Sequence, residues 1–397
     1  MTTAIEAYFA QHGASFTALR RDIHAHPELC FAEERTSALV AAQLRALGIE
    51  THTGLGKTGV VGVIKKGNST ASIGLRADMD ALPITELNTF AHQSRYPGKM
   101  HACGHDGHTA ILLATAQYLA QEQEFNGTVY LIFQPAEEGG GGAAAMMRDG
   151  LFERFPMDAV YGLHNWPGMP TGSVAASAGP VMASSNEFKI TLRGKGCHAA
   201  MPHLGHDPVV AAAALIQGFQ TIVSRNLKPI DDSVISVTIL RAGEATNVVP
   251  NTCTLEGTVR TFTLEVLDLI EARMKAMSDA ISAAYGCSAE FQFERNYPPT
   301  INHAAQTQVV REVASRVLGP GQLQEQEPTM GAEDFAYMLQ AKPGCYFFLG
   351  NGEGEHRTSG HGMGPCMLHN PSYDFNDALI PVGDQIWAAL VADQLPV

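Results

Sequence analysis

Side chains that bind transition metals gather in one short segment, HACGHDGHT (101–109). Cys103 and His105 are separated by a single glycine, a spacing that allows both side chains to reach one site from a loop. Thiolate and imidazole are ligands of zinc and of other divalent transition metals. We therefore predict a metal site here, although a buried thiol beside helix-capping polar residues is the simpler alternative. His101 and His108 are expected to support the site or the fold.

Two adjacent carboxylates follow an apolar run in the segment QPAEEGG (134–140). Neighbouring carboxylates are unstable together in a cleft of low dielectric unless cations compensate them or one of them takes a proton. Glu137 and Glu138 therefore suit a catalytic base and a metal ligand. A surface acidic turn is the ordinary explanation of an isolated Glu-Glu pair, but the position at a strand end before four glycines favours the functional one.

Further candidates stand at other predicted strand ends and loops. His164 lies in YGLHN and His369 in MLHNPSYDFND, where a lone histidine is usually structural. Together with the pairs above, they supply enough ligands for two metal ions. In the segment GLRADMDALP (74–83), a predicted strand ends with Asp78 and Asp80, which could orient ligands by hydrogen bonds. Simple capping of the strand end would explain them equally well.

These groups follow the predicted strands of an α/β domain. The strands are expected at 60–66, 72–78, 127–135 and 158–164, with a helix at 109–121. This order predicts a largely parallel sheet covered by helices, and such sheets place their ligands at the carboxyl ends of strands. A helix at 304–318, a strand at 345–350 and a terminal helix at 377–395 would complete the domain.

A different pattern occupies residues 184–296. Strands are expected at 187–194, 233–240, 252–262 and 289–296, with helices at about 208–225 and 264–285. Asp207 and Pro208 suit the N-cap and first turn of one helix, and Gly286 suits the end of the other. The order β-α-β-β-α-β is the ferredoxin-like split unit. We therefore predict a domain inserted between two parts of the first domain, 1–183 and 297–397.

Composition limits the class of partner. The chain of 397 residues is longer than one hydrophobic core usually organises, so we expect two domains. Its hydrophobic content of 45% is enough to form a large core. The net charge of −14 would repel nucleic acid and anionic membranes. The first twenty residues lack the uninterrupted apolar region of a signal peptide, and no segment approaches the roughly 18 apolar residues that span a bilayer. Seven scattered cysteines argue against a disulfide framework, so we expect a cytoplasmic protein.

The ordered set of motifs resembles a family of peptidase-like metallo-amidohydrolases that contains the hippurate hydrolases, aminoacylases and plant auxin-conjugate hydrolases. Besides the segments above, the resemblance rests on RRDIHAHPE (20–28), GKGCHAAMPH (194–203), NVVPNTCTLEGTVR (247–260) and GAEDFA (331–336). It covers essentially the whole chain. It implies a zinc-peptidase-like catalytic domain, an inserted ferredoxin-like dimerisation or lid domain, and a homodimer or homotetramer.

The resemblance also implies roles for individual residues. A binuclear centre of Mn, Zn, Co or Ni would be bound by Cys103, His105, Glu138, His164 and His369. Glu137 would be the catalytic base. His198 matches a histidine that, in the wider clan, reaches the partner subunit's active site and donates to the developing oxyanion. Asn247 and Arg260 match positions that bind substrate oxygen and carboxylate groups.

The expected reaction is metal-dependent hydrolysis of the amide bond of an N-acyl amino acid, with a small-molecule substrate. A dipeptidase or carboxypeptidase of the same clan and an N-acetyl-diaminopimelate deacetylase are alternatives, as is a non-enzymatic metal or small-ligand binding protein. A TIM-barrel amidohydrolase built on HAH (24–26) is disfavoured, because the preceding residues have a helical pattern and eight βα repeats are absent. The residues do not distinguish the acyl group, the amino acid or the metal.

Overall fold

The computed structural model describes residues 2–397, with side chains from Ile5 onward, and it divides into two compact units. The first unit comprises the chain up to Gly179, together with Ile301–Glu327 and Asp334–Val397. The second comprises Pro180–Thr300 and Pro328–Glu333. The predicted insertion, 184–296, lies inside the second unit.

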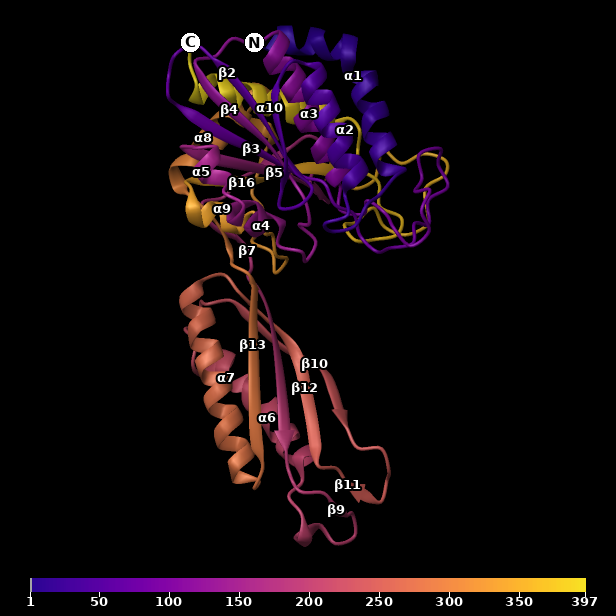
Figure 1. The fold of residues 1–397 in the computed structure, drawn as a ribbon, viewed down its shortest axis with the longest axis vertical. Helices are drawn as coiled ribbons and strands as arrows, with labels where there is room; N and C mark the ends of the chain where they lie inside the picture. Colours follow the sequence, from indigo (N-terminus) through magenta and orange to yellow (C-terminus); the bar gives the residue numbers. More distant parts are fainter. Residues whose placement is uncertain (1) are drawn as a thin grey trace. The chain divides into compact units, whose positions relative to one another are not determined.

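The first unit is built on an eight-stranded sheet in the order β1-β2-β4-β3-β5-β16-β6-β15. Its strands are β1 (Glu50–Leu55), β2 (Gly59–Lys66), β3 (Ser72–Asp78), β4 (Gly127–Gln134), β5 (Ala159–Pro167), β6 (Val174–Ala175), β15 (Leu323–Gln324) and β16 (Gly344–Gly352). Figure 1 labels the strands β2, β4, β3, β5 and β16 of this sheet. The four central strands, β4, β3, β5 and β16, are parallel, as predicted. The sheet as a whole is mixed, because β1 and β2 form an antiparallel hairpin beside β4 and β6 is antiparallel to β16.

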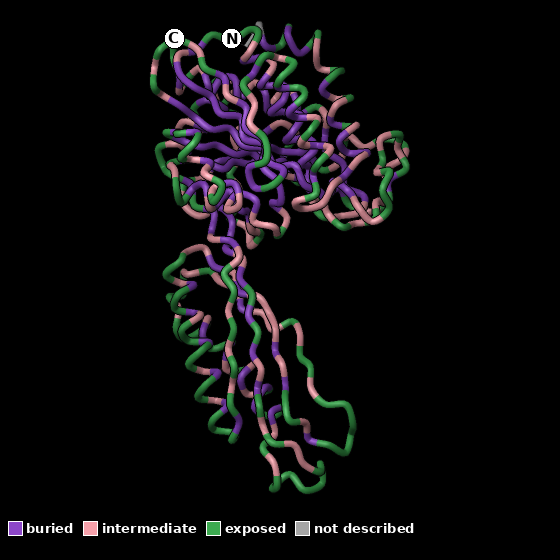
Figure 2. Tube along the Cα trace, viewed as in Figure 1, coloured by how far each residue is buried: buried purple, intermediate pink, exposed green. Residues whose placement is uncertain are grey.

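Helices α3 and α10 pack against each other and against β3. The helices of this unit are α1 (Thr2–His24), α2 (Glu34–Ala46), α3 (His105–Gln121), α4 (Gly142–Arg148), α5 (Leu151–Arg154), α8 (Ala304–Leu318), α9 (Ala336–Ala341) and α10 (Leu379–Gln394). Helix α3 is rich in alanine and leucine and is buried along most of its length, as a helix apolar on nearly all sides should be. Figure 2 shows buried residues along the strands of this unit. Because α3 is buried from its first residue, His105, the start of this helix is fixed in the core.

The second unit has its own sheet and core. Its main elements follow in the order β8 (Ser185–Arg193), α6 (Pro208–Arg225), β10 (Ser233–Ala242), β12 (Thr252–Thr261), α7 (Leu264–Ala284) and β13 (Ser288–Tyr297). The strands form an antiparallel sheet in the order β10-β12-β8-β13. As predicted, Asp207 caps α6 by accepting from the Val209 amide, and Gly286, at φ +69°, follows the end of α7.

Apolar side chains of the sheet and of both helices form the core of the second unit, including Phe188, Ile190, Leu215, Phe219 and Ile270. The opposite side of β8 carries polar residues, which gives this strand its alternating burial. Within the described part of the chain, none of the helices is both long enough and apolar enough to cross a membrane.

Candidate metal centre

The carboxyl ends of the central parallel strands bring several polar side chains to one edge of the sheet. Asp78 ends β3, Gln134 ends β4, and His164 lies near the end of β5. His105 is the first residue of α3, which packs on β3. This edge is where open α/β sheets bind ligands, because the loops that leave parallel strands converge there.

The five predicted ligands converge at this edge in two groups of three. In each group, one potential ligand atom from every residue lies within 4.8 Å of the others. The first group is Cys103, His105 and His164, and the second is Cys103, Glu138 and His369. Cys103 belongs to both groups, so the two candidate metal sites share it as a potential ligand. Glu137 forms a further such group with His105 and Glu138.

The histidines of the first group have ring orientations suited to a metal. His164 Nδ1 lies 2.6 Å from the Asn165 carbonyl oxygen, and its Nε2 lies 3.3 Å from Cys103 Sγ. His105 Nδ1 lies 2.8 Å from the Asp80 carbonyl oxygen. Its Nε2 is buried without a hydrogen-bond partner, with the nearest carboxylate oxygen, of Asp78, 3.7 Å away. One nitrogen anchored on a carbonyl and the other turned to neighbouring ligands is the usual arrangement of a metal-binding histidine.

His108 differs from these two, because both of its ring nitrogens have protein partners. Nδ1 lies 2.7 Å from Asp78 Oδ1, and Nε2 accepts from the Asn165 amide at 2.9 Å. With Nε2 as an acceptor, the proton sits on Nδ1 and is donated to Asp78. His108 therefore links β3 to β5 behind the ligands, a supporting position like the one predicted.

Asp80 anchors the segment that carries the two glutamates. Its Oδ1 accepts from the Glu137 amide at 3.0 Å, and its Oδ2 accepts from the Glu138 amide at 2.9 Å. The Glu138 carboxylate in turn lies 3.1 Å from Nε2 of His369. His369 has a positive φ of +61°, and its amide donates to the Ala102 carbonyl. These contacts bring a loop from the end of the chain to the Cys103 segment.

The pKa shifts of the side chains in this site favour bound cations. Burial, reinforced by the Glu138 and Glu137 carboxylates, raises the pKa of the Cys103 thiol well above its ordinary value. Burial also lowers the pKa of His164 well below its usual range, so this ring is neutral and free to coordinate. Burial opposes protonation of His105, but the Asp78 and Asp80 carboxylates outweigh it and raise its pKa to about 10.

Bound divalent cations would relieve these conflicts. They deprotonate a coordinating thiol, displace the proton of His105 and compensate the paired carboxylates. The unpartnered Nε2 of His105 and the thiolate, imidazole and carboxylate donor set both fit transition-metal ions.

Sequence reasoning missed the residues that lock the Cys103 loop in place. Asn165 donates to the Cys103 carbonyl at 2.6 Å and accepts from the Tyr373 hydroxyl at 2.7 Å. Gly104 has φ +93°, and a Cβ there would lie 2.1 Å from the side-chain nitrogen Nδ2 of Asn165. Asn165 and Tyr373 both stand inside motifs that contain a ligand, GLHN and HNPSYDFND, which was the available signal.

The histidines of the HAH motif belong to none of the potential metal-ligand groups among the described residues. His24 ends α1 rather than a strand, and its ring lies 2.8 Å from the Asp106 carboxylate and 3.2 Å from that of Glu86. Both carboxylates raise the pKa of His24 to about 9 against the opposing effect of burial. His24 therefore belongs to a buried charge network.

The other predicted residues belong to the second unit. His198 lies in the two-residue strand β9 (Cys197–His198), opposite β11 (Val248–Val249), and is exposed. Asn247 precedes β11, and its main-chain carbonyl accepts from the Ala199 amide at 3.0 Å. Burial lowers the pKa of Arg260, on β12, and the Glu187 carboxylate opposes this effect. The catalytic or substrate-binding roles of these residues stay predictions.

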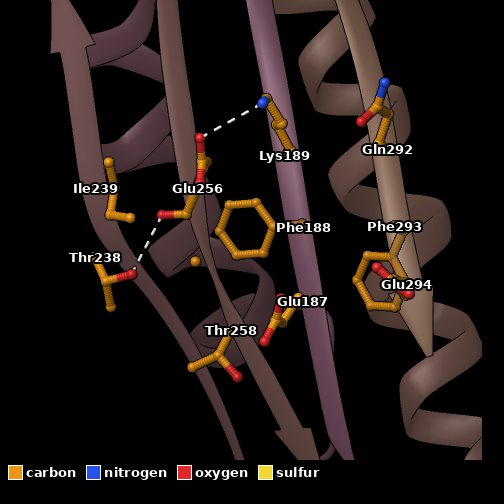
Figure 3. Close-up of a pocket in the computed structure, with 11 residues that line it drawn as sticks. Glu187, Phe188, Lys189, Thr238, Ile239, Glu256, Thr258, Gln292, Phe293 and Glu294 are labelled. Carbon is orange, nitrogen blue, oxygen red and sulfur yellow. Dashed lines mark hydrogen bonds and ion pairs between the residues drawn. The ribbon is translucent and has the colours of Figure 1, made fainter. Parts of the chain in front are cut away.

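A hollow of about 600 Å³ lies on the sheet of the second unit (Figure 3). Its lining includes Lys189 and Glu256, whose charged atoms are 3.7 Å apart, and the Thr238 hydroxyl, which donates to the Glu256 carbonyl. None of the predicted site residues lines this hollow. Lys189, the one basic residue of the lining, is already paired with Glu256, so the size of the hollow does not by itself make it a site.

Comparisons with known proteins agree with this geometry. The model of peptidase family M20/M25/M40 matches residues 74–393. The chain is 40% identical to the hippurate hydrolase of Campylobacter jejuni, covering 96% of both chains. It is 41% identical to the N-acetyl-L-cysteine deacetylase of Bacillus subtilis, covering 91% of this chain and 84% of the relative.

Among solved structures, the chain resembles the Bacillus subtilis YXEP protein, a dinuclear metal-binding peptidase of the M20 family. The TM-score is 0.84 at 34% identity, covering 97% of this chain and 99% of the other. The match extends over both units and therefore over the Cys103 site.

Proposed function

The chain belongs to peptidase family M20/M25/M40, and from this we propose that it is an amidohydrolase that cleaves the amide bond of N-acyl amino acids to a carboxylic acid and a free amino acid. Two relatives with about 40% identity over most of the chain, a hippurate hydrolase and an N-acetyl-L-cysteine deacetylase, support this reaction. The observation that carries the proposal is the convergence of two three-residue ligand groups on Cys103 with Glu137 beside them.

Two divalent cations would be held by Cys103, His105, Glu138, His164 and His369. When bound, such ions polarise the scissile carbonyl and make hydroxide available near neutral pH. The unpartnered Nε2 of His105 and the shared position of Cys103 support this assignment. The thiolate favours softer transition metals over magnesium or calcium.

Glu137 is the proposed proton carrier. It takes a proton from the attacking water as the oxygen adds to the carbonyl carbon, and it later gives that proton to the leaving nitrogen. The carbon–nitrogen bond then breaks, and the amino group leaves as a neutral amine. The main-chain amide of Glu137 is fixed on Asp80, which supports a defined position for this carboxylate.

We assign the remaining roles to the second unit. His198 would donate a hydrogen bond to the oxyanion of the tetrahedral intermediate, and Asn247 and Arg260 would bind the substrate's oxygen and carboxylate groups. The β-α-β-β-α-β order and the sheet order β10-β12-β8-β13 support a ferredoxin-like lid or dimerisation domain. A dimer or tetramer in the cytoplasm remains part of the proposal.

The proposal is tested with a panel of substrates in which each acyl group is combined with each amino acid. N-benzoyl, N-acetyl and indole-acetyl conjugates of several amino acids are incubated with enzyme loaded with Mn, Co, Zn or Ni, and the released amino acid is measured. Turnover that a chelator abolishes and added metal restores is the expected result. Preferential cleavage of dipeptides would replace the proposal with a dipeptidase, and the absence of chelator-sensitive turnover on every amide would favour a binding protein.

A further inference from the structure

The main chain that carries Glu137 is held by three buried carboxylates from other parts of the first unit. We call residues 134–143 the catalytic segment. Glu33 accepts from its Ala136 amide at 2.9 Å, and Asp334 accepts from its Ala143 amide at 2.8 Å. Asp80 accepts from the two amides between them, as described above. All three carboxylate residues are at most 1% exposed.

Glu33 differs from the other two because it holds the segment at a strained point. Ala136, the residue before Glu137, has φ +53°. This left-handed conformation is unfavourable for any residue with a Cβ atom and persists only where the surroundings impose it. The bond from the Ala136 amide to Glu33 Oε1 is a direct contact that can impose it.

The same oxygen also holds a second strained residue. Glu33 Oε1 accepts from the amide of Phe31, which has φ +58°, at 3.0 Å. The Phe31 ring lies over Gly140 of the catalytic segment, where an added Cβ would approach the ring within 3.1 Å. The other oxygen, Oε2, accepts from the Thr58 hydroxyl at 2.6 Å, which fixes the carboxylate from a third direction.

From this geometry we propose that Glu33 is a positioning residue for Glu137, which it aims by holding the peptide immediately before it. The inference rests on the proposed role of Glu137 as the base. Glu33 is bound to three protein donors, and its contact with the site is through the main chain of Ala136. A displacement of the base by about 1 Å can cost on the order of a hundredfold in rate.

The test compares Glu33→Leu with Glu33→Gln. Leucine fills the space but accepts no hydrogen bond, whereas the glutamine oxygen can accept from both amides while its NH₂ group donates to Thr58. The matched control is Glu28→Leu, which removes a carboxylate that accepts from the Arg35 and Thr36 amides at the start of α2 instead. Each variant is assayed for kcat, KM, metal content and hydrogen exchange of the peptide that covers 134–143.

We expect Glu33→Leu to lower kcat by roughly ten- to a hundredfold with KM and metal content little changed. Its catalytic segment should exchange amide hydrogens faster than in the wild type. Glu33→Gln should restore kcat to within about threefold of the wild type, and Glu28→Leu should leave the exchange of the segment unchanged. Unchanged kcat and exchange in a folded Glu33→Leu protein would overturn the inference, as would equal losses in Glu28→Leu.

A milder variant keeps the proposal open to refutation if Glu33→Leu does not fold. Thr58→Val removes only the hydroxyl that fixes Oε2, and it should accelerate exchange of the catalytic segment and lower kcat in the same direction. A folded Thr58→Val protein with wild-type exchange and kcat would then count against the inference. If the wild type cleaves no amide, the proposed function fails, while hydrogen exchange still reports whether Glu33 holds the segment.

Discussion

At the scale of single residues, the two adjacent glutamates of the site have different surroundings. Both main-chain amides are bound by Asp80, while Glu138 lies 3.1 Å from His369 and shares a potential ligand group with Cys103. Glu137 belongs to neither of the two groups built on Cys103. This difference supports the proposed assignment of Glu137 as the proton carrier and of Glu138 as a metal ligand.

We predict that Glu137→Gln retains both metal ions and lowers kcat by roughly a thousandfold, because general acid–base catalysis contributes 10²–10⁴. Glu138→Gln is the matched variant, and it should lose bound metal because a neutral amide is a weaker ligand. Amino-acid release and metal content by mass spectrometry measure the two effects. A Glu137→Gln enzyme with wild-type turnover would remove Glu137 from the mechanism.

The sequence indicated which residue types form the site but not how they are oriented. Cys103, His105 and the Glu137–Glu138 pair could be selected as candidates because metal-binding residue types cluster at predicted strand ends and loops. The spacing to Cys103 favoured His105 over His108 as a ligand, and the ring partners support this choice. They are a carbonyl of Asp80 for His105 and two polar groups for His108. Glu33 carried no signal, because Ala136, its contact in the catalytic segment, lies far along the chain.

At the scale of elements, the turn into α3 sets the position of Cys103 and His105. Gly104 occupies the position before the helix with φ +93°, and a Cβ there would lie 2.1 Å from the Asn165 side chain and 2.6 Å from the Tyr373 hydroxyl. We predict that Gly104→Ala destabilises the first unit by about 3 kcal/mol and abolishes metal binding, since strain and overpacking add. Urea unfolding and metal titration measure these effects.

Gly168 offers a matched control for this turn. Its φ of +91° is nearly the same, but a Cβ there would meet nothing within 4 Å. Gly168→Ala should therefore cost only the left-handed strain, about 1 kcal/mol, and should keep its metals. Equal losses in the two variants would show that crowding at Asn165 is unimportant.

Element types were more predictable than their arrangement. The long strands and helices have clear apolar periods, and α6 and α8 begin and end where their caps and patterns predicted. The hairpin of β1 and β2 makes the edge antiparallel because a short turn can join only antiparallel neighbours. The two-residue strands β6 and β15 have no period to detect, so only the fold itself shows them.

At the scale of the whole molecule, one buried acid in α10 makes the stability of the first unit depend on pH. Burial raises the pKa of Asp384 to about 7, and the nearby Thr115 hydroxyl only partly offsets this effect. The folded state holds the Asp384 proton more tightly than the unfolded chain does. The contribution of this group to the free energy of unfolding is therefore complete below about pH 4 and is lost as pH rises through 7.

Asp384→Asn should remove this dependence. The variant should be more stable than the wild type at pH 8 by about 4 kcal/mol, and the two should converge near pH 4. Urea unfolding of the metal-free proteins across this range measures the difference. A constant difference at every pH would show that Asp384 does not change its protonation on unfolding.

The two units have separate cores, while all five proposed ligands belong to the first unit. We therefore predict two calorimetric transitions, of which a chelator lowers only one. Saturation at a hundred times Kd stabilises a folded unit by about 3 kcal/mol, which is worth roughly 5 °C or more in Tm. Ile190→Ala, in the core of the second unit, should lower the other transition alone and so identify it. If the chelator shifts both transitions equally, metal binding is coupled to the second unit. The role of the metal ions in hydrolysis must then include ordering of the second unit.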